Sequence, residues 1–309
     1  MRVHVFTFQI PLTQFFNKQF LILQAMKKII LSAFFISALV CGTSAQERFN
    51  PVELQGEFGV TFGAAHYFGD LNTRASLNRP KIALGVFYRK QFNNYLAARL
   101  AVHYAQLGYS DTYSKNEYQK QRNLSFNTDI FEIALSGDFN FFRYQPGDPA
   151  HSFTPYVTLG LGLFSYNPYA YLNGKKYYLR PLGTEGQNIS YSDAATGTTR
   201  KPYGSMSMCV PIGMGIKYNI NDKFNLSFQI AHRLTFTDYL DDVSTTYVGA
   251  DKFPNPTALA LQDRSFEKVA NVIGIEGRQR GWSKQKDQYI IAEIGVTFNI
   301  TSYKCPSDF

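Results

Sequence analysis

The chain has 309 residues and a formal net charge of +8, with 45% hydrophobic and 16% aromatic residues, including 27 Phe and 21 Tyr. Its slightly negative mean hydropathy excludes a bundle of apolar membrane helices. A soluble α/β enzyme rarely carries so much Phe and Tyr, whereas alternating strands joined by polar loops give this mixture.

Residues 1–45 have the three parts of a secretory signal peptide in the right order. The basic pair is Lys27–Lys28, and the apolar run that follows is Ile29–Cys41. The two small residues are Thr43 and Ala45. The apolar run is shorter than the roughly 20 residues of a membrane-spanning helix. We therefore expect cleavage after Ala45, with a buried helix as the competing interpretation. Residues 1–25, which precede Met26, are either a mis-assigned start or an extended signal.

Cleavage would remove four basic residues and no acidic one, so the formal charge would fall from +8 to +4. That charge is not typical of a nucleic-acid-binding protein. Cys41 would leave with the signal, and Val40 before it is larger than a lipoprotein signal requires. Cys209 and Cys305 remain. An exported pair could form a disulfide, but these two lie at opposite ends of different segments, which does not favour one.

Eight segments alternate apolar with polar or small side chains at a period of two, which predicts eight β-strands. In chain order they are Leu54–Phe62, Ile82–Arg89, Leu96–Tyr104, Phe131–Phe141, Val157–Leu163, Val210–Ile220, Phe224–Phe236 and Gln288–Ile300.

The connections between these segments alternate in length. Three are short, at Asn93–Asn94, Arg143–Ser152 and Asn221–Asp222. Four are long and polar, at Gly69–Arg79, Gly108–Asn127, Asn167–Gly204 and Thr237–Lys286. Short turns at one end and long loops at the other predict an all-β fold, an eight-stranded antiparallel transmembrane β-barrel of the outer-membrane type over residues 46–300. Residues 301–309 would form a short tail. A soluble sandwich has no reason to sort its connections by end.

The faces opposite the apolar ones carry charges that we expect inside the barrel as a lumen charge network. Four acids and four bases balance there: Glu57, Arg89, Arg99, Glu132, Asp138, Lys217, Arg233 and Glu293. A low-dielectric interior tolerates charges only when they are paired. Because eight strands leave room only for side chains, we expect a plug of ion pairs and no general pore. A soluble barrel with an ordinary polar surface would need no such balance.

Aromatic residues mark both ends of the predicted strands, as in interfacial girdles. Phe92, Tyr95, Phe141, Phe142, Tyr218 and Phe224 flank the short turns, and Tyr67, Phe68, Tyr104, Phe164, Tyr166 and Phe236 flank the long loops. His232 interrupts an apolar face near the loop end, where an interfacial position is expected. In the last strand, Glu293, Gly295, Phe298 and Ile300 resemble the signal of the outer-membrane barrel-assembly machinery.

We predict no catalytic, cofactor-binding or metal-binding residues and no enzymatic activity. His66, Asp70 and the acidic run Asp238–Asp242 lie where barrel enzymes place catalytic groups, at the loop rim. The run could bind a cation through carboxylate oxygens. A solvated or loop-ordering acidic turn is the simpler interpretation.

Two loop segments, "HYFGDLN" (His66–Asn72) and "TDYLDDVSTTYVG" (Thr237–Gly249), resemble the PorG-like outer-membrane barrels of Bacteroidota. The second is the more specific, through Asp238, Tyr239, Leu240, Asp241 and Asp242. The resemblance implies a component of the type IX protein secretion machinery that is not the translocation pore. It also implies association with a periplasmic ring of PorK-like and PorN-like proteins. The alternative is a stand-alone surface barrel that binds ligands or host factors through its loops.

Overall fold

A computed structural model describes residues 52–192, 197 and 199–303 of the chain. The predicted signal peptide, its cleavage site and Cys305 lie outside the described residues. Among the described residues, no helix is long and apolar enough to cross a membrane.

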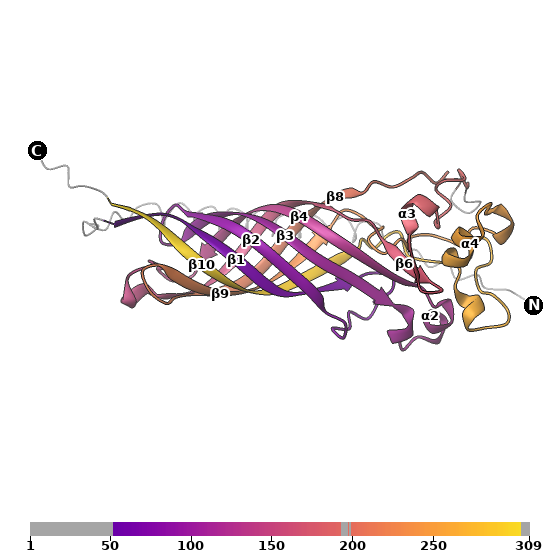
Figure 1. The fold of residues 1–309 in the computed structure, drawn as a ribbon, viewed down its shortest axis with the longest axis horizontal. Coiled ribbons are helices and arrows are strands. Elements are labelled where there is room, and N and C mark those ends of the chain that lie inside the picture. Colours follow the sequence, from indigo (N-terminus) through magenta and orange to yellow (C-terminus); the bar gives the residue numbers. More distant parts are fainter. Residues whose placement is uncertain (1–51, 193–196, 198, 304–309) are drawn as a thin grey trace, which may run out of the picture. The chain divides into compact units, whose positions relative to one another are not determined.

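Eight long antiparallel strands form a closed barrel (Figure 1). They are β1 (Val52–Phe68), β2 (Lys81–Gln91), β3 (Leu96–Ser110), β4 (Ser125–Asn140), β5 (Phe153–Ser165), β8 (Met206–Asn219), β9 (Phe224–Thr235) and β10 (Gln288–Tyr303). Each strand pairs with its neighbours in the chain, and β1 pairs with β10, with Phe58 opposite Phe298. The ring therefore has no open edge over its paired length, which satisfies the backbone polar groups internally. The predicted fold class is confirmed.

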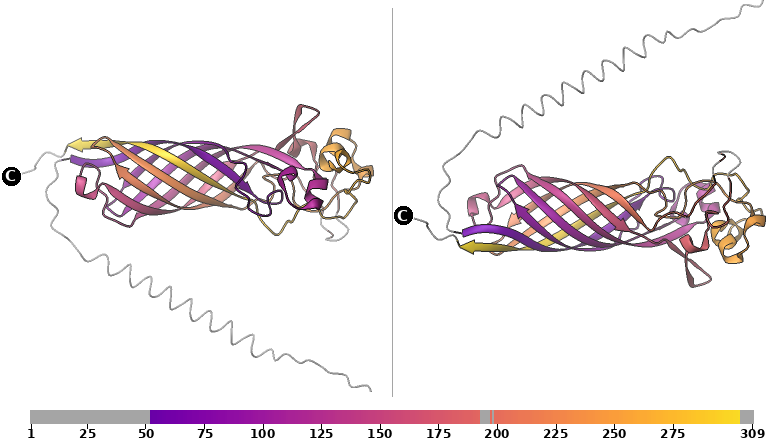
Figure 2. Two further views of the ribbon diagram at one scale, coloured as in Figure 1. Left: turned by 90° about the horizontal axis from the view of Figure 1, so that it is seen from below. Right: turned by 90° about the horizontal axis from the view of Figure 1, so that it is seen from above.

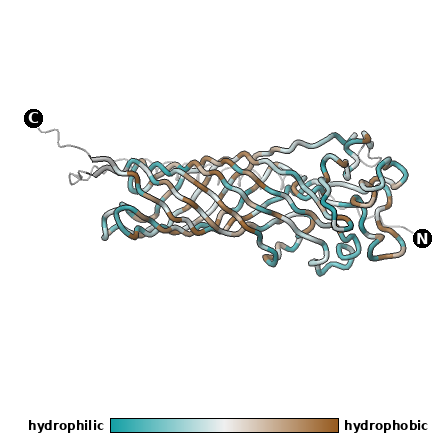
Figure 3. The backbone as a smooth tube through the Cα atoms, in the orientation of Figure 1, coloured by the Kyte–Doolittle hydropathy of each residue, from teal (hydrophilic) through white to brown (hydrophobic). Residues whose placement is uncertain are grey.

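The strands alternate as predicted between side chains that face inward and side chains that face outward. Along β4, Ile133 and Leu135 are exposed, whereas Glu132 and Asp138 are buried. Figure 3 shows apolar residues distributed along the whole barrel wall. A barrel with an apolar outside and a charged inside is the reverse of a soluble one, so its outer surface suits lipid. The soluble alternatives are therefore wrong.

The strands extend unequally at both ends of the barrel. At the short-turn end β1 and β10 stay paired as far as Val52 opposite Tyr303, whereas β9 and β10 are paired only as far as Phe224 opposite Phe298. The pairing of β3 with β4 continues from Gly108 opposite Asn127 to Ser110 opposite Ser125. The predicted loop Gly108–Asn127 is therefore shorter than expected, because both strands extend beyond their apolar segments.

The long loops contain short helices and one extra hairpin. The helices are η2 (Asp111–Tyr113), α2 (Glu117–Arg122), α3 (Leu179–Leu182), η4 (Ala250–Lys252), α4 (Pro256–Gln262) and η5 (Ser265–Glu267), while η3 (Pro149–His151) lies in a short turn. The hairpin pairs β6 (Tyr169–Leu172) with β7 (Lys175–Tyr178). Its turn, Asn173–Gly174, has positive φ at both positions, as a tight two-residue turn requires. Together the long loops form a cap at one end of the barrel (Figure 2).

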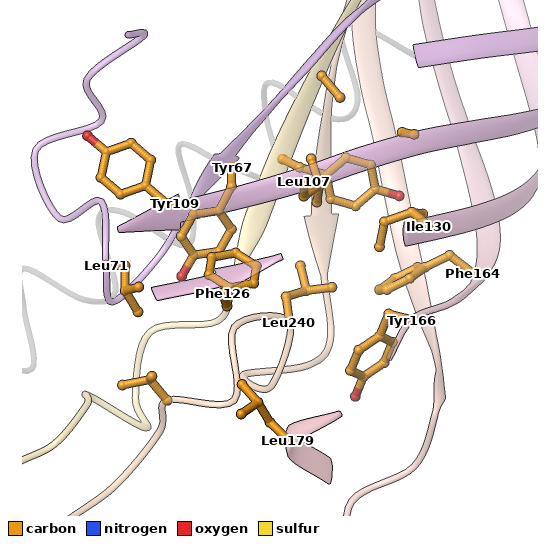
Figure 4. Close-up of a cluster of buried hydrophobic side chains, with 14 of the residues drawn as sticks. Tyr67, Leu71, Leu107, Tyr109, Phe126, Ile130, Phe164, Tyr166, Leu179 and Leu240 are labelled. Atoms are coloured by element: carbon orange, nitrogen blue, oxygen red, sulfur yellow. The ribbon is translucent and has the colours of Figure 1, made fainter. Parts of the chain in front are cut away.

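A hydrophobic cluster lies under this cap (Figure 4). Tyr67, Phe164 and Tyr166, which we expected in the outer aromatic girdle, are buried in it. That expectation was wrong for these three, because their positions in the strand alternation turn them inward. Phe236 is exposed as predicted, and so are all six aromatic residues at the short turns.

Candidate functional site: a filled lumen and a loop cap

Asp138 is the centre of one charge cluster in the lumen, nearer the short turns. Its carboxylate lies 2.9 Å from Nε of Arg89, 3.5 Å from Nη2 of Arg99 and 3.5 Å from Nζ of Lys217. Arg89 also reaches Glu57, with Nη1 2.9 Å from Oε2. All five side chains are buried, so each charge depends on its partners rather than on water.

Glu132 is the centre of a second cluster, nearer the loops. One of its oxygens lies 3.4 Å from Nε of Arg233 and accepts a hydrogen bond from the Tyr289 hydroxyl at 2.5 Å. Its other oxygen lies 3.1 Å from Nδ1 of His103, and Nε2 of that ring is 3.5 Å from Glu293. The imidazole of His103 on β3 therefore joins the carboxylates of β4 and β10, two strands that are separated in the ring by β1, β2 and β3.

The structure thus places all eight predicted lumen charges inside the barrel. Seven of them lie within 4 Å of an opposite charge, and Glu293 lies 3.5 Å from the titratable ring of His103. The balance holds across the lumen and not within each cluster. The first cluster has two acids and three bases, and the second has two acids, Arg233 and the titratable His103. Gln229 connects them, since its Oε1 accepts from Arg99 of the first cluster and its Nε2 donates to Glu293 of the second at 3.4 Å.

His103 is the network member that the sequence analysis did not select. It lies four residues after Arg99 on the same strand and therefore faces the same side, so strand alternation alone would have placed it in the lumen. Gly85 lies opposite it on β2, and a Cβ there would approach the imidazole ring to 2.5 Å. The glycine therefore leaves the space that the ring occupies.

Tyr144, from the turn Arg143–Ser152, covers the lumen at the short-turn end. Its side chain is completely buried, and Nζ of Lys217 lies 5.9 Å from the centre of its ring. The lumen is therefore filled by aromatic and charged side chains from the first cluster to this turn, which does not suit a wide aqueous channel.

The acidic run Asp238–Asp242 is buried and organises the last loop. Asp238 accepts from the Ser244 hydroxyl at 2.5 Å, and Asp241 accepts from the backbone N–H of Val243 at 2.9 Å. The backbone N–H of Leu240 donates to Asp287 at 2.9 Å. The suggestion of a solvated turn is wrong, and these bonds are those of a loop-ordering turn.

Arg280 joins the third and fourth loops. Its guanidinium contacts the carboxylate of Glu185, lies 3.9 Å from a carboxylate oxygen of Asp242, and donates to the carbonyl of Gln262 at 3.1 Å. Arg122 of α2 donates to the carbonyl of Arg280 at 2.5 Å, which adds the second loop. Three separate loops are therefore held together by two buried arginines.

Burial raises the pKa of several carboxyl groups in the cap. It raises the pKa of Asp238 and of Asp242 to about 7 and that of Asp70 to about 6. The pKa values of Asp241 and Asp287 lie well above the usual range, because both groups are buried and lie near other acids. Part of the cap is therefore uncharged near neutral pH.

The remaining candidate residues have structural partners. The His66 ring contacts the carbonyl of Ser76 at 2.6 Å, and Asp70 accepts from the backbone N–H of Trp282 at 2.8 Å. His232 lies 2.7 Å from the side chain of Gln288. In the part of the chain that the structure describes, no group of three or more acidic, His or Cys side chains is arranged to hold a metal ion.

The proposed assembly signal in β10 divides between the two faces. Glu293 points into the lumen, whereas Phe298 and Ile300 are exposed on the outer face near the short turns. Cys209 is buried and unbridged, with Sγ 3.7 Å from Glu132.

A closed eight-stranded ring, an apolar outer wall and a filled, charged lumen define a transmembrane β-barrel of the outer-membrane type. Residues 34–185, just under half of the chain, match a family model described as a domain of unknown function (DUF6089). No protein of curated function matches the sequence.

Several solved outer-membrane barrels are similar in fold. Neisserial surface protein A is 12% identical, with 81% of this chain and 100% of that protein covered and a TM-score of 0.39. Ail of Yersinia pestis, solved with the heparin analogue sucrose octasulfate, is 9% identical, with 80% and 100% covered and a TM-score of 0.35. OprG of Pseudomonas aeruginosa is 10% identical, with 81% and 96% covered and a TM-score of 0.28.

Proposed function

We propose that this protein is a non-enzymatic outer-membrane component of the type IX protein secretion machinery. Its partners would be the PorK-like and PorN-like proteins of the periplasmic ring. The outer wall would contact outer-membrane lipid, and the β10 signal would be recognised by the barrel-assembly machinery during biogenesis.

One observation carries this proposal: the segment that most specifically resembles the PorG-like barrels is part of the framework of the cap. Asp238, Asp241 and Asp242 are buried, and each accepts a hydrogen bond from within the loops. Residues used in this way are constrained by the whole loop assembly, unlike exposed loop residues. The filled lumen suits a protein that acts through its two ends rather than as a channel.

The ring would contact the short turns, which are the parts of the barrel expected to face the periplasm. Arg143 and Lys223 are exposed in two of these turns. Exchanging both for Glu reverses two charges without touching the lumen. We expect the Arg143→Glu/Lys223→Glu variant to retain several-fold less ring protein on purification from outer membranes and to export less cargo carrying a C-terminal sorting domain.

The matched control reverses two exposed lysines in the loops at the opposite end, Lys115→Glu and Lys201→Glu, and should leave export unchanged. Deletion of the gene should stop cargo export. Normal export in the deletion strain would exclude this function.

A stand-alone surface barrel that binds a ligand through its loops is the second candidate. Large apolar side chains exposed on the ordered cap favour it, among them Phe266, Ile275 and Trp282. Shortening 167–204 or 240–286 should then abolish ligand binding and leave export intact. The secretion proposal predicts instead that changes at the short turns reduce export.

A further inference from the structure

The β6–β7 hairpin exposes one face of tyrosine and lysine side chains. Tyr169 is paired with Tyr178 and Tyr171 with Lys176, so these four side chains share a face of the hairpin. Tyr171 and Tyr178 are 49% and 43% exposed, and Lys176 is exposed beside them. Lys175 pairs with Leu172 and so starts from the opposite face, where its Nζ lies 5.3 Å from the ring centre of Tyr177.

The opposite face holds the hairpin in place. Ala170 is buried, and Leu172 and Tyr177 pack against the hydrophobic cluster under the cap. Because one face packs against the cap, the other is presented in a defined orientation and does not need to be ordered by a ligand.

The exposed face continues the lipid-facing wall of the barrel. Tyr169 pairs with Asn127 of β4. Phe131 lies on the same outer side of β4 and is exposed, and its ring contacts that of Tyr104, with centroids 5.1 Å apart. The hairpin then projects sideways from the barrel wall instead of continuing along it (Figures 1 and 2). A wall that bends outward turns its outer face towards the surface of the membrane.

The chemistry of this face suits the headgroup region of a bilayer. Nζ of Lys176 lies 3.6 Å from the ring centre of Tyr169 and 4.8 Å from that of Tyr178. Tyrosine rings settle at the level of lipid headgroups, and lysine is a point charge that attracts phosphate. The nearby carboxylate of Asp129 accepts a hydrogen bond from the Tyr104 hydroxyl at 3.0 Å, which engages one of its oxygens.

We propose that Tyr169, Tyr171, Lys176 and Tyr178 form a docking surface for phosphorylated lipid headgroups of the leaflet at the loop end. This inference does not depend on the secretion proposal. The charge complements phosphate, and the surface is continuous with the wall that already contacts lipid. Each lysine close to an anionic membrane surface strengthens association by about fivefold.

The test uses the folded mature protein in lipid nanodiscs, made of phosphatidylcholine alone or of phosphatidylcholine with lipid A. Backbone hydrogen–deuterium exchange over 169–178 is measured in both. We expect exchange to slow by about fivefold in the lipid A discs, since one lysine of this face, Lys176, contributes. The Lys176→Gln variant should lose this protection.

Lys268→Gln/Lys284→Gln, which removes two exposed lysines of the last loop, is the matched control and should keep the protection. Tyr171→Ser/Tyr178→Ser should weaken it, and heat-dependent gel mobility checks that every variant is folded. Equal exchange in the two kinds of disc, or protection that survives the loss of Lys176, would overturn the proposal. Protection by inorganic phosphate added to phosphatidylcholine discs would overturn it too, by showing recognition of free phosphate.

Discussion

Nε of Arg89 on β2 lies 2.9 Å from Oδ2 of Asp138 on β4, although these two strands are separated by β3 in the ring. The contact lies inside the lumen and joins strands that share no backbone hydrogen bonds. Because Arg99 and Lys217 also lie 3.5 Å from this carboxylate, one acid holds three bases in the interior.

Replacing Asp138 with Asn should therefore destabilise the barrel strongly. Removing one partner of a buried ion pair leaves uncompensated charge and costs about 3–5 kcal/mol. The free energy of unfolding is measured by urea titration in detergent micelles. Asp148→Asn is the control, since Asp148 pairs with His151 in a turn where both are about one-third exposed, and it should change the free energy of unfolding little because water screens this pair. Equal losses for the two variants would argue against a structural role for the lumen network.

Leu161 tests whether the outer wall contacts lipid. It is 60% exposed on β5 and faces away from the lumen, whereas Leu77 is 70% exposed in the first loop. Leu161→Arg should destabilise the folded protein in a bilayer by roughly 2–4 kcal/mol, because a basic group at the midplane is poorly solvated. Leu77→Arg should have almost no effect. If unfolding from lipid vesicles shows the same stability for both, the wall does not face hydrocarbon.

Arg280 should control the closure of the cap without affecting the barrel. Arg280→Ala leaves Glu185 and Asp242 without their buried cation and removes the bond to the carbonyl of Gln262. We expect limited proteolysis within 237–286 to become at least several-fold faster, while heat-dependent gel mobility remains unchanged. Arg278→Ala removes an exposed arginine of the same loop that lies 5.1 Å from the Tyr118 ring, and should change proteolysis little. Loss of the barrel in the Arg280 variant would contradict this separation.

The cap should also loosen as the pH rises. Burial raises the pKa of Asp238 to about 7, with Asp70 and Glu185 adding negative charge and Lys286 opposing them. The closed cap therefore binds more protons than the open one between the ordinary carboxyl pKa and about 7. Its stability is greatest below that range and falls as the pH rises through it.

We expect loop proteolysis to be slower at acidic than at alkaline pH, after correction for protease activity on an unfolded substrate. Asp238→Asn should flatten the pH profile, because the amide stays neutral throughout. The exposed acid Asp222 lies at the other end of the barrel, so Asp222→Asn should leave the profile as it is. Faster loop proteolysis at acidic than at alkaline pH would show that these groups are charged in the closed cap.

The sequence was sufficient for the wall of the barrel. Along Phe131–Phe141, whether a side chain faces the lumen or the outside depends only on its odd or even position. Successive side chains of a strand point to opposite sides. The same rule placed all eight lumen charges inside. It also applied to Tyr67 and Phe164, which we assigned to the outer girdle from their place near the strand ends and which lie inside.

A local signal for the β6–β7 hairpin was present as well. Asn173–Gly174 between tyrosine-rich segments is a strong hairpin turn, yet we predicted one long loop over Asn167–Gly204. We did not predict β6 and β7 from strand alternation, because each strand has only four residues.

The sequence by itself determined the strands, their two faces and the sorting of short and long connections, since these depend on residues next to one another in the chain. Only the tertiary structure decided that Arg89 meets Asp138, that His103 joins two carboxylates, and that Arg280 closes the cap over the acidic run. Those contacts depend on the stagger between strands and on how loops far apart in the chain pack together. No local pattern records either, because the free energy of each contact arises only when the ring has closed.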